Sequence, residues 1–213
     1  LHRAVWSIPS LQVLAACGGG GASSGTSGGV QSGVALKGLL EDFRVFVDAN
    51  GNGVYDAGEA NTLSAADGSF SLSVPAGSVL SGEVTTTTVD HASGRVIEGL
   101  FLSAPSGAAI LSPMTTIIEQ TGLSEAEVRQ ALGLSVNLLE YNPFAAANVA
   151  SDEARAVEPV AQQIANITRN LMAVGEGAGL SSRAAFDIAS AAFNSVLTNH
   201  VTAGTAGALD LWG

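Results

Sequence analysis

The chain has 213 residues, which is enough for one or two domains with a hydrophobic core. Its 19 acidic side chains outnumber the 8 basic ones, and a surface with a formal net charge of −11 repels nucleic acid and anionic lipid headgroups. One cysteine cannot form an internal disulfide framework, and the absence of any apolar window of about 18 residues predicts no internal membrane span.

The first segment has the order of an export signal, with an apolar run that ends in "LAAC" at residues 14–17. This order resembles a bacterial lipoprotein signal peptide with its lipobox, covering residues 1–17. The resemblance implies that Cys17 is acylated and that the lipid chains attach the protein to a membrane. The residue after the cysteine is Gly18 and not an aspartate, which in that family is compatible with the outer membrane of the cell envelope. A tail with a chance cysteine is the alternative.

Residues 18–33 are nearly all Gly, Ser, Ala and Thr. Such a composition cannot bury enough apolar surface to fold, so it predicts a disordered tether. A tether that begins directly after an acylated Cys17 would lift the folded part of the chain off the membrane.

Residues 34–112 show short apolar runs that alternate with turn residues, which is typical of β-strands. The pattern predicts a small antiparallel β-sandwich. The expected strands are 34–38, 44–48, 61–64, 69–74, 83–90, 95–102 and 108–111.

One loop of this β domain, "DANGNGVYDAGE", is rich in oxygen side chains. Its spacing fits the calcium-loop pattern, in which alternate residues of a tight turn point at one hard cation and a glycine at position six permits the turn. Neither His nor Cys lies in the loop, which makes zinc a poor candidate. Loop positions one, three, five, seven, nine and twelve are Asp48, Asn50, Asn52, Val54 through its carbonyl, Asp56 and Glu59.

The loop follows a strand-like "RVFV" and has no helices at its flanks, so it is not a helix–loop–helix hand. The stretch "VFVDANGNGVYDAGE" resembles the calcium loops of SdrD B-like and Cna B-type modules, which are prealbumin-like sandwiches in bacterial adhesins. The resemblance implies a bound Ca²⁺ and a surface location. The alternative is an Asn-Gly-rich hairpin loop that binds no ion.

Residues 113–203 change to a helical period. Pro113 suits the first position of a helix, and Ser124 with Glu127 forms a capping box. A short helix is expected within 140–149 and a longer one from near Pro159, and we expect residues 204–213 to be a frayed tail. An α+β fold results, with a β-sandwich followed by a small helical bundle. The expected apolar face of the longer helix consists of Val160, Ile164, Ile167, Leu171 and Val174.

No catalytic residues are predicted. Asp90, His91 and Ser93 come close together in the sequence, but we expect the hairpin turn that carries them to expose them to water without a cleft or an oxyanion hole.

Two classes of function remain. The first is a non-enzymatic calcium-binding lipoprotein of the cell envelope, with an adhesive, structural or display role and a surface protein or a glycan as partner. The second is a ligand-binding or accessory lipoprotein with a groove between the β and helical parts. An apolar pocket at that junction would favour the second class.

Overall fold

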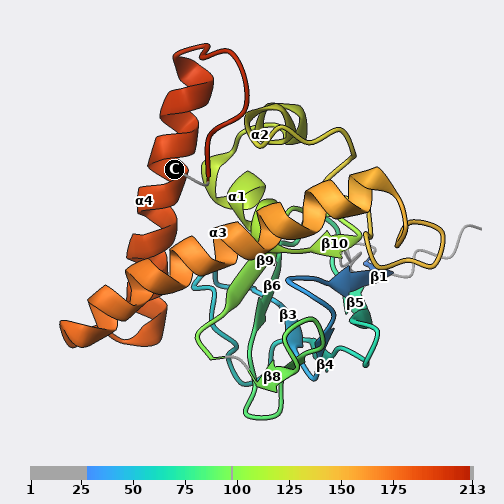
Figure 1. Ribbon diagram of the computed structural model, residues 1–213. Helices are drawn as coiled ribbons and strands as arrows, with labels where there is room; N and C mark the ends of the chain where they lie inside the picture. Colours follow the sequence, from blue (N-terminus) through green and yellow to red (C-terminus); the bar gives the residue numbers. More distant parts are fainter. Residues whose placement is uncertain (1–27, 97, 212–213) are drawn as a thin grey trace, which may run out of the picture.

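The computed structural model describes residues 28–96 and 98–211, and its strands come before its helices in the chain (Figure 1). The α+β class predicted from the sequence is therefore confirmed. The strands are β1 Gly29–Ala35, β2 Leu40–Glu41, β3 Arg44–Val47, β4 Asn61–Leu63, β5 Ser69–Val74, β6 Leu80–Glu83, β7 Val89–Asp90, β8 Arg95–Val96, β9 Phe101–Ala104 and β10 Ile110–Leu111. The helices are α1 Pro113–Thr121, α2 Glu125–Ala131, α3 Asp152–Gly177 and α4 Ser182–Thr202.

The described residues form three sheets, of which one is the small β2-β7-β8 sheet and the other two pack around one apolar core. Of these two, the first has the strand order β4-β3-β6-β9 and is antiparallel throughout. The second has the order β10-β1-β5, in which β1 runs antiparallel to β5 and parallel to β10. Strand β5 shows why the sheets pack together, since its residues alternate between exposed serines and buried apolar side chains. The core includes Ala35, Phe43, Val45, Phe70, Leu72, Val74, Leu80, Leu102 and Leu111.

Strand β1 shows that the predicted tether boundary is wrong, because Gly29–Gly33 pair with β5 along their whole length. Small residues can form this strand because the backbone supplies the ladder, and the Gln31 side chain adds a 2.6 Å hydrogen bond to the Ala108 carbonyl. At Gly33 a Cβ atom would lie 2.6 Å from the Ala109 carbonyl oxygen, so glycine permits a close approach. Residues 1–27, with Cys17 and the rest of the predicted tether, lie outside the described residues.

The predicted strands 83–90 and 95–102 are also wrong as continuous elements, since each contains a loop. Hydroxyl groups of Thr85 and Thr88 each donate to the Asp42 carbonyl at 2.9 Å. The Thr88 hydroxyl also accepts from the Thr85 amide at 2.7 Å. These side-chain hydrogen bonds compete with the backbone hydrogen bonds that would continue the β-strand, and they outweigh the β propensity of threonine.

The helix-start signals in the sequence predict the first residues of α1 and α2 correctly. Pro113 is the first residue of α1, and the predicted capping box of Ser124 and Glu127 closes the start of α2. The predicted helix within 140–149 is absent, because that segment forms turns. Helix α3 begins at Asp152, capped by Ser151, and Pro159 lies inside it. Among the described helices, none combines the length and apolarity needed to cross a bilayer.

The predicted apolar face of α3 is only partly right. Ile164 is buried, but Leu171 and Val174 are exposed. Small residues take part of the core side instead, where they allow close approach to the neighbouring elements. The buried residues of α3 are Ala154, Val157, Ala161, Ile164, Ala165, Thr168 and Met172.

The predicted frayed tail is ordered up to Leu211. Its Leu209 amide donates to the Ala131 carbonyl at 2.7 Å, and the Gln163 side chain donates to the Leu211 carbonyl at 2.9 Å. The tail therefore folds back from the end of α4 onto α2 and α3.

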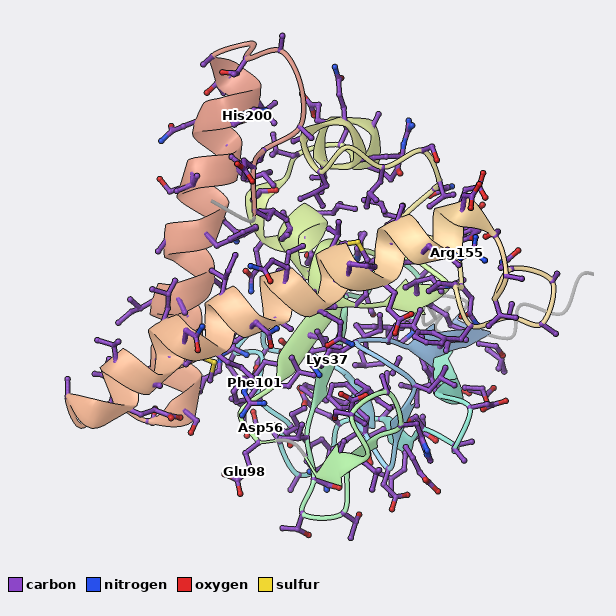
Figure 2. All side chains as sticks on the ribbon, viewed as in Figure 1. Lys37, Asp56, Glu98, Phe101, Arg155 and His200 are labelled. Carbon is purple, nitrogen blue, oxygen red and sulfur yellow. The ribbon has the colours of Figure 1, made fainter. Side chains whose placement is uncertain are left out.

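The helices lie against the β part through polar as well as apolar contacts. Thr115 and Thr116 of α1 both hydrogen-bond to the backbone of Ser103 in β9. Gln162 of α3 donates to the carbonyl of Lys37, which lies beside α3 in Figure 2. The Lys37 ammonium in turn forms a 2.6 Å ion pair with Asp90, with 7% and 0% of the two side chains exposed. This buried pair joins two segments of the β part directly under the long helix.

Candidate calcium loop

The loop from Asp48 to Glu59 connects β3 to β4, whose antiparallel register pairs Phe46 with Asn61. It is therefore the connection of a β-hairpin, as its strand-like flank predicted. Gly51 and Gly53 have φ angles of 72° and 68°, which side chains other than glycine rarely adopt. The loop thus turns at position six of the calcium pattern as expected.

Asp48 organises the first half of the loop. Its Oδ1 atom accepts hydrogen bonds from the Gly51 and Asn52 amides at 2.7 and 3.1 Å. Its Oδ2 atom accepts from the Gly53 amide at 2.7 Å and from the Ser81 hydroxyl of β6 at 3.3 Å. One carboxylate therefore holds the turn closed and ties it to the neighbouring strand.

The other predicted ligands meet in the second half of the loop. Asn50 and Asn52 each donate through Nδ2 to the same Oδ2 atom of Asp56 at 2.7 Å. Glu59 accepts from the Ala49 amide at 2.9 Å and from the Asp56 amide at 3.0 Å. The side chains of all five predicted residues thus belong to one hydrogen-bonded loop.

The donor chemistry fits a hard cation, because the loop offers carboxylate, amide and carbonyl oxygens and no nitrogen or sulfur ligand. The Val54 carbonyl, at position seven, accepts no hydrogen bond from the described residues. The carboxylates of the loop do not converge on one point, since the described residues contain no group of three or more His, Cys, Asp or Glu side chains placed to hold a metal. Amide-to-carboxylate hydrogen bonds hold the loop together instead.

Arg183, in the first turn of α4, contacts the loop from the helical side. Its guanidinium donates to the Gly53 carbonyl and forms a 2.8 Å ion pair with Asp187. The same group lies 5.2 Å from the ring centre of Phe101 and 5.6 Å from that of Phe186, within cation–π range. Gly53 is not one of the predicted ligand positions, so Arg183 holds the loop without using a ligand carbonyl. Sequence reasoning missed this contact because nothing local links residues so far apart.

A polar cleft of about 270 Å³ lies beside this contact, and its lining comes from the loop, from β6 and β9, and from α1 and α4. The loop contributes Asp48 to its lining and β6 contributes Ser81. Glu119 and Gln120 of α1 and Arg183 of α4 form the opposite side. The predicted groove between the β and helical parts therefore exists at this point, with a mainly polar lining.

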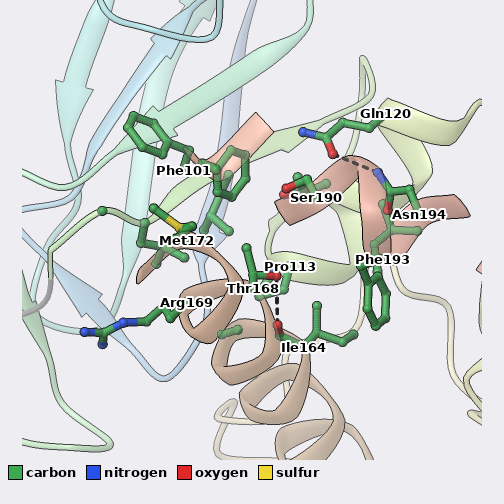
Figure 3. Close-up of a pocket in the computed structure, with 17 residues that line it drawn as sticks. Phe101, Pro113, Gln120, Ile164, Thr168, Arg169, Met172, Ser190, Phe193 and Asn194 are labelled. Atoms are coloured by element: carbon green, nitrogen blue, oxygen red, sulfur yellow. Dashed lines mark hydrogen bonds between the residues drawn. The ribbon is translucent and has the colours of Figure 1, made fainter. Parts of the chain in front are cut away.

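The apolar pocket at the same junction is much smaller, at about 30 Å³ (Figure 3). Phe101, Met172 and Phe193 are among its lining residues, and a 2.9 Å hydrogen bond joins Gln120 to Asn194 at its polar side. That volume suits about one water molecule. It does not suit an apolar ligand.

The residues Asp90, His91 and Ser93 do not form a catalytic chain. Asp90 is fully buried, which corrects the expectation that the turn exposes it to water. It pairs with Lys37 and accepts a 2.9 Å hydrogen bond from the Ser93 hydroxyl. His91 instead pairs with Glu41 at 2.8 Å. His200 lies near the far end of α4, away from Asp56 (Figure 2).

No protein-family model, no curated protein and no solved structure matches the chain. The fold and the loop themselves therefore define the class, an α+β protein with an oxygen-rich hairpin loop held against a helix.

Proposed function

We propose that the chain is a non-enzymatic, calcium-binding lipoprotein of the bacterial cell envelope, with an adhesive, structural or display role. The observation that supports it is the hydrogen-bonded hairpin loop itself, in which Asn50 and Asn52 donate to Asp56 and the Gly53 amide donates to Asp48. Calcium would be held by Asp48, Asn50, Asn52, the Val54 carbonyl, Asp56 and Glu59. A bound Ca²⁺ supplies positive charge that offsets the repulsion of three carboxylates, and it would fasten the end of β3 to the start of β4.

Calorimetric titration of a fragment of residues 28–211 with CaCl₂ tests calcium binding. We expect heat of binding at or below millimolar calcium, the range of extracellular calcium modules. Glu59→Gln removes one carboxylate oxygen of the residue at position twelve and should weaken binding by roughly tenfold or more, about 1.4 kcal/mol. The matched control is Asp67→Asn, in the separate turn before β5. Equal heats for Glu59→Gln and the parent fragment would exclude Glu59 as a ligand, and no heat at all would exclude the site.

Mass spectrometry of the protein expressed in a Gram-negative host tests the lipid anchor. The mature chain should begin at Cys17 and carry acyl chains, because "LAAC" places the cysteine at a lipobox cleavage site. Cys17→Ser should leave the signal uncleaved and the chain without acyl groups. A free thiol on an uncleaved parent chain would contradict the anchor.

The polar cleft favours a second candidate, a lipoprotein that binds a small polar ligand between its β and helical parts. The cleft is about 270 Å³ in volume, and the side chains of Glu119, Gln120 and Arg183 offer both acceptors and donors to a ligand. Thermal-shift screening with small polar metabolites tests this candidate. A shift that Glu119→Gln abolishes would support it, and a hit that Glu119→Gln leaves unchanged would place the ligand elsewhere.

A further inference from the structure

Tyr55, at position eight of the candidate calcium loop, is held against the sheet from several sides. Its ring lies edge-on to the Phe46 ring, with the ring centres 5.8 Å apart and the ring planes at 71°. The Arg44 guanidinium lies 4.4 Å from the centre of the Tyr55 ring, within cation–π range. Asn61 donates through Nδ2 to the Tyr55 hydroxyl at 3.1 Å. The second half of the loop is therefore fastened to β3 and β4.

Glu83, the last residue of β6, contacts both the sheet and the loop backbone. In the register of the sheet it lies directly opposite Arg44, and its Oε1 atom accepts a 3.0 Å hydrogen bond from the Arg44 guanidinium. Its Oε2 atom accepts from the Tyr55 amide at 3.4 Å. Only 15% of the Glu83 side chain is exposed. The two oxygens of one mostly buried carboxylate therefore join the strand pair to the loop.

The Tyr55 amide belongs to the same peptide group as the Val54 carbonyl, which is the predicted calcium ligand at position seven. None of the described peptide bonds is cis, and in a planar trans peptide the N–H and C=O bonds point in opposite directions. Because Glu83 accepts from the N–H of this group, the Val54 carbonyl points away from Glu83. That carbonyl accepts no hydrogen bond from the described residues, so its oxygen is available to a cation.

We propose that Glu83 is a positioning residue of the calcium loop, which sets the direction of the Val54 carbonyl and thereby the affinity for calcium. This inference rests on the proposed calcium binding and extends it to a residue outside the loop. A peptide group that is free to rotate loses conformational entropy when an ion orders it, and a group that is ordered beforehand loses less. Removal of a partner that orients a metal ligand typically weakens metal binding by about 10–100-fold.

Two double variants isolate the hydrogen bond to the Tyr55 amide. Arg44→Met with Glu83→Gln and Arg44→Met with Glu83→Leu have the same charge, and neither contains the ion pair. Only the Gln variant keeps an acceptor oxygen at residue 83. Titration calorimetry with CaCl₂ compares the two in the full chain carrying Cys17→Ser, which excludes acylation. We expect the dissociation constant for calcium to be roughly tenfold higher in the Leu variant.

Hydrogen exchange of the Tyr55 amide gives a second readout, which needs neither calcium nor a substitution in the sheet. With chelator, this amide should be more protected than the Ala57 amide, which donates to no acceptor among the described residues. Weaker calcium binding by the Leu variant together with a protected Tyr55 amide supports the proposal.

Equal dissociation constants for the two double variants overturn the role of Glu83 and leave calcium binding intact, as does an unprotected Tyr55 amide. If circular dichroism shows that either variant is unfolded, the protection of the Tyr55 amide in the chain with residues 44 and 83 unchanged decides the question. If that chain binds no calcium, the proposed function itself is wrong and the role of Glu83 is lost with it.

Discussion

Lys37→Met should lower the free energy of unfolding by about 3–5 kcal/mol, because it leaves the Asp90 carboxylate buried without its cation. The two groups are 2.6 Å apart and almost fully removed from solvent. Ser93 and the Ala92 amide would still donate to Asp90, but neither supplies a positive charge. Urea unfolding followed by circular dichroism measures the change.

Two further variants test whether the destabilisation comes from the unpaired charge of Asp90. Lys37→Met combined with Asp90→Leu should recover much of the loss, since no unpaired charge then remains. Arg155→Met breaks an exposed pair with Asp152, whose side chains are 68% and 95% exposed, and should cost less than about 1 kcal/mol. A loss for Lys37→Met as small as that for Arg155→Met would show that Asp90 reaches water in the folded protein.

The same pair predicts the acid sensitivity of the fold. Burial raises the pKa of Asp90, but the hydrogen bonds from Lys37 and Ser93, the Lys37 charge and the Ala92 amide outweigh it, so the pKa lies below the ordinary 3.8. The stabilisation by ionised Asp90 is therefore fully present above pH 3.8 and is lost as the pH falls below that value. The Lys37→Met variant should show a weaker loss of stability over that acid range.

Removal of calcium should cost about 2.7 kcal/mol of folding free energy, if the free calcium concentration before removal is a hundred times the dissociation constant of the loop for calcium. Three carboxylates of one short loop would then repel one another without a counter-ion. Because Arg183 fastens Gly53 to the start of α4, the loss should extend from β3 and β4 into α4. Hydrogen exchange with calcium and with chelator follows the strands and the helix separately.

Arg183→Met tests whether this contact carries the effect into the helix. In that variant, calcium should still protect β3 and β4, but the protection of α4 should no longer respond to chelation. Arg169→Met is the control, since the exposed Arg169 side chain extends away from the pocket beside it (Figure 3). If chelation changes α4 equally in the Arg183 and Arg169 variants, the helix senses the loop by another route. If chelation leaves the strands unchanged in the parent protein, calcium has no stabilising role.

Local signals predicted a good part of this fold. Ser124 and Glu127 marked a helix start, the alternation of β5 marked a strand with one buried face, and the loop from Asp48 to Glu59 was placed correctly between two strands. Each signal depends on residues within a few positions of one another. The predicted turn at Gly53 is also present, since glycine permits the positive φ found there.

Distant contacts decided what the sequence could not predict. Gly29–Gly33 form a strand because β5 and Ala108 meet them, and their own composition favours disorder. The Thr85 and Thr88 hydroxyl groups turn to the Asp42 carbonyl, which no local pattern indicates. Arg183 contacts the candidate calcium loop from 130 residues further along the chain, which no local pattern indicates either. Helix α3 packs its alanines inward because of what lies beside them, which exposes Leu171 and Val174.

The early start of β1 limits how far the folded part can stand from a membrane. If Cys17 carries the lipid, residues 18–28 separate it from Gly29, and eleven residues span at most about 40 Å when fully extended. A flexible chain of that length would have an average end-to-end distance of about 18 Å. Strand β1 and helix α4 lie on opposite sides of the molecule (Figure 1), so an anchor close to β1 would leave α4 on the side that faces away from the bilayer.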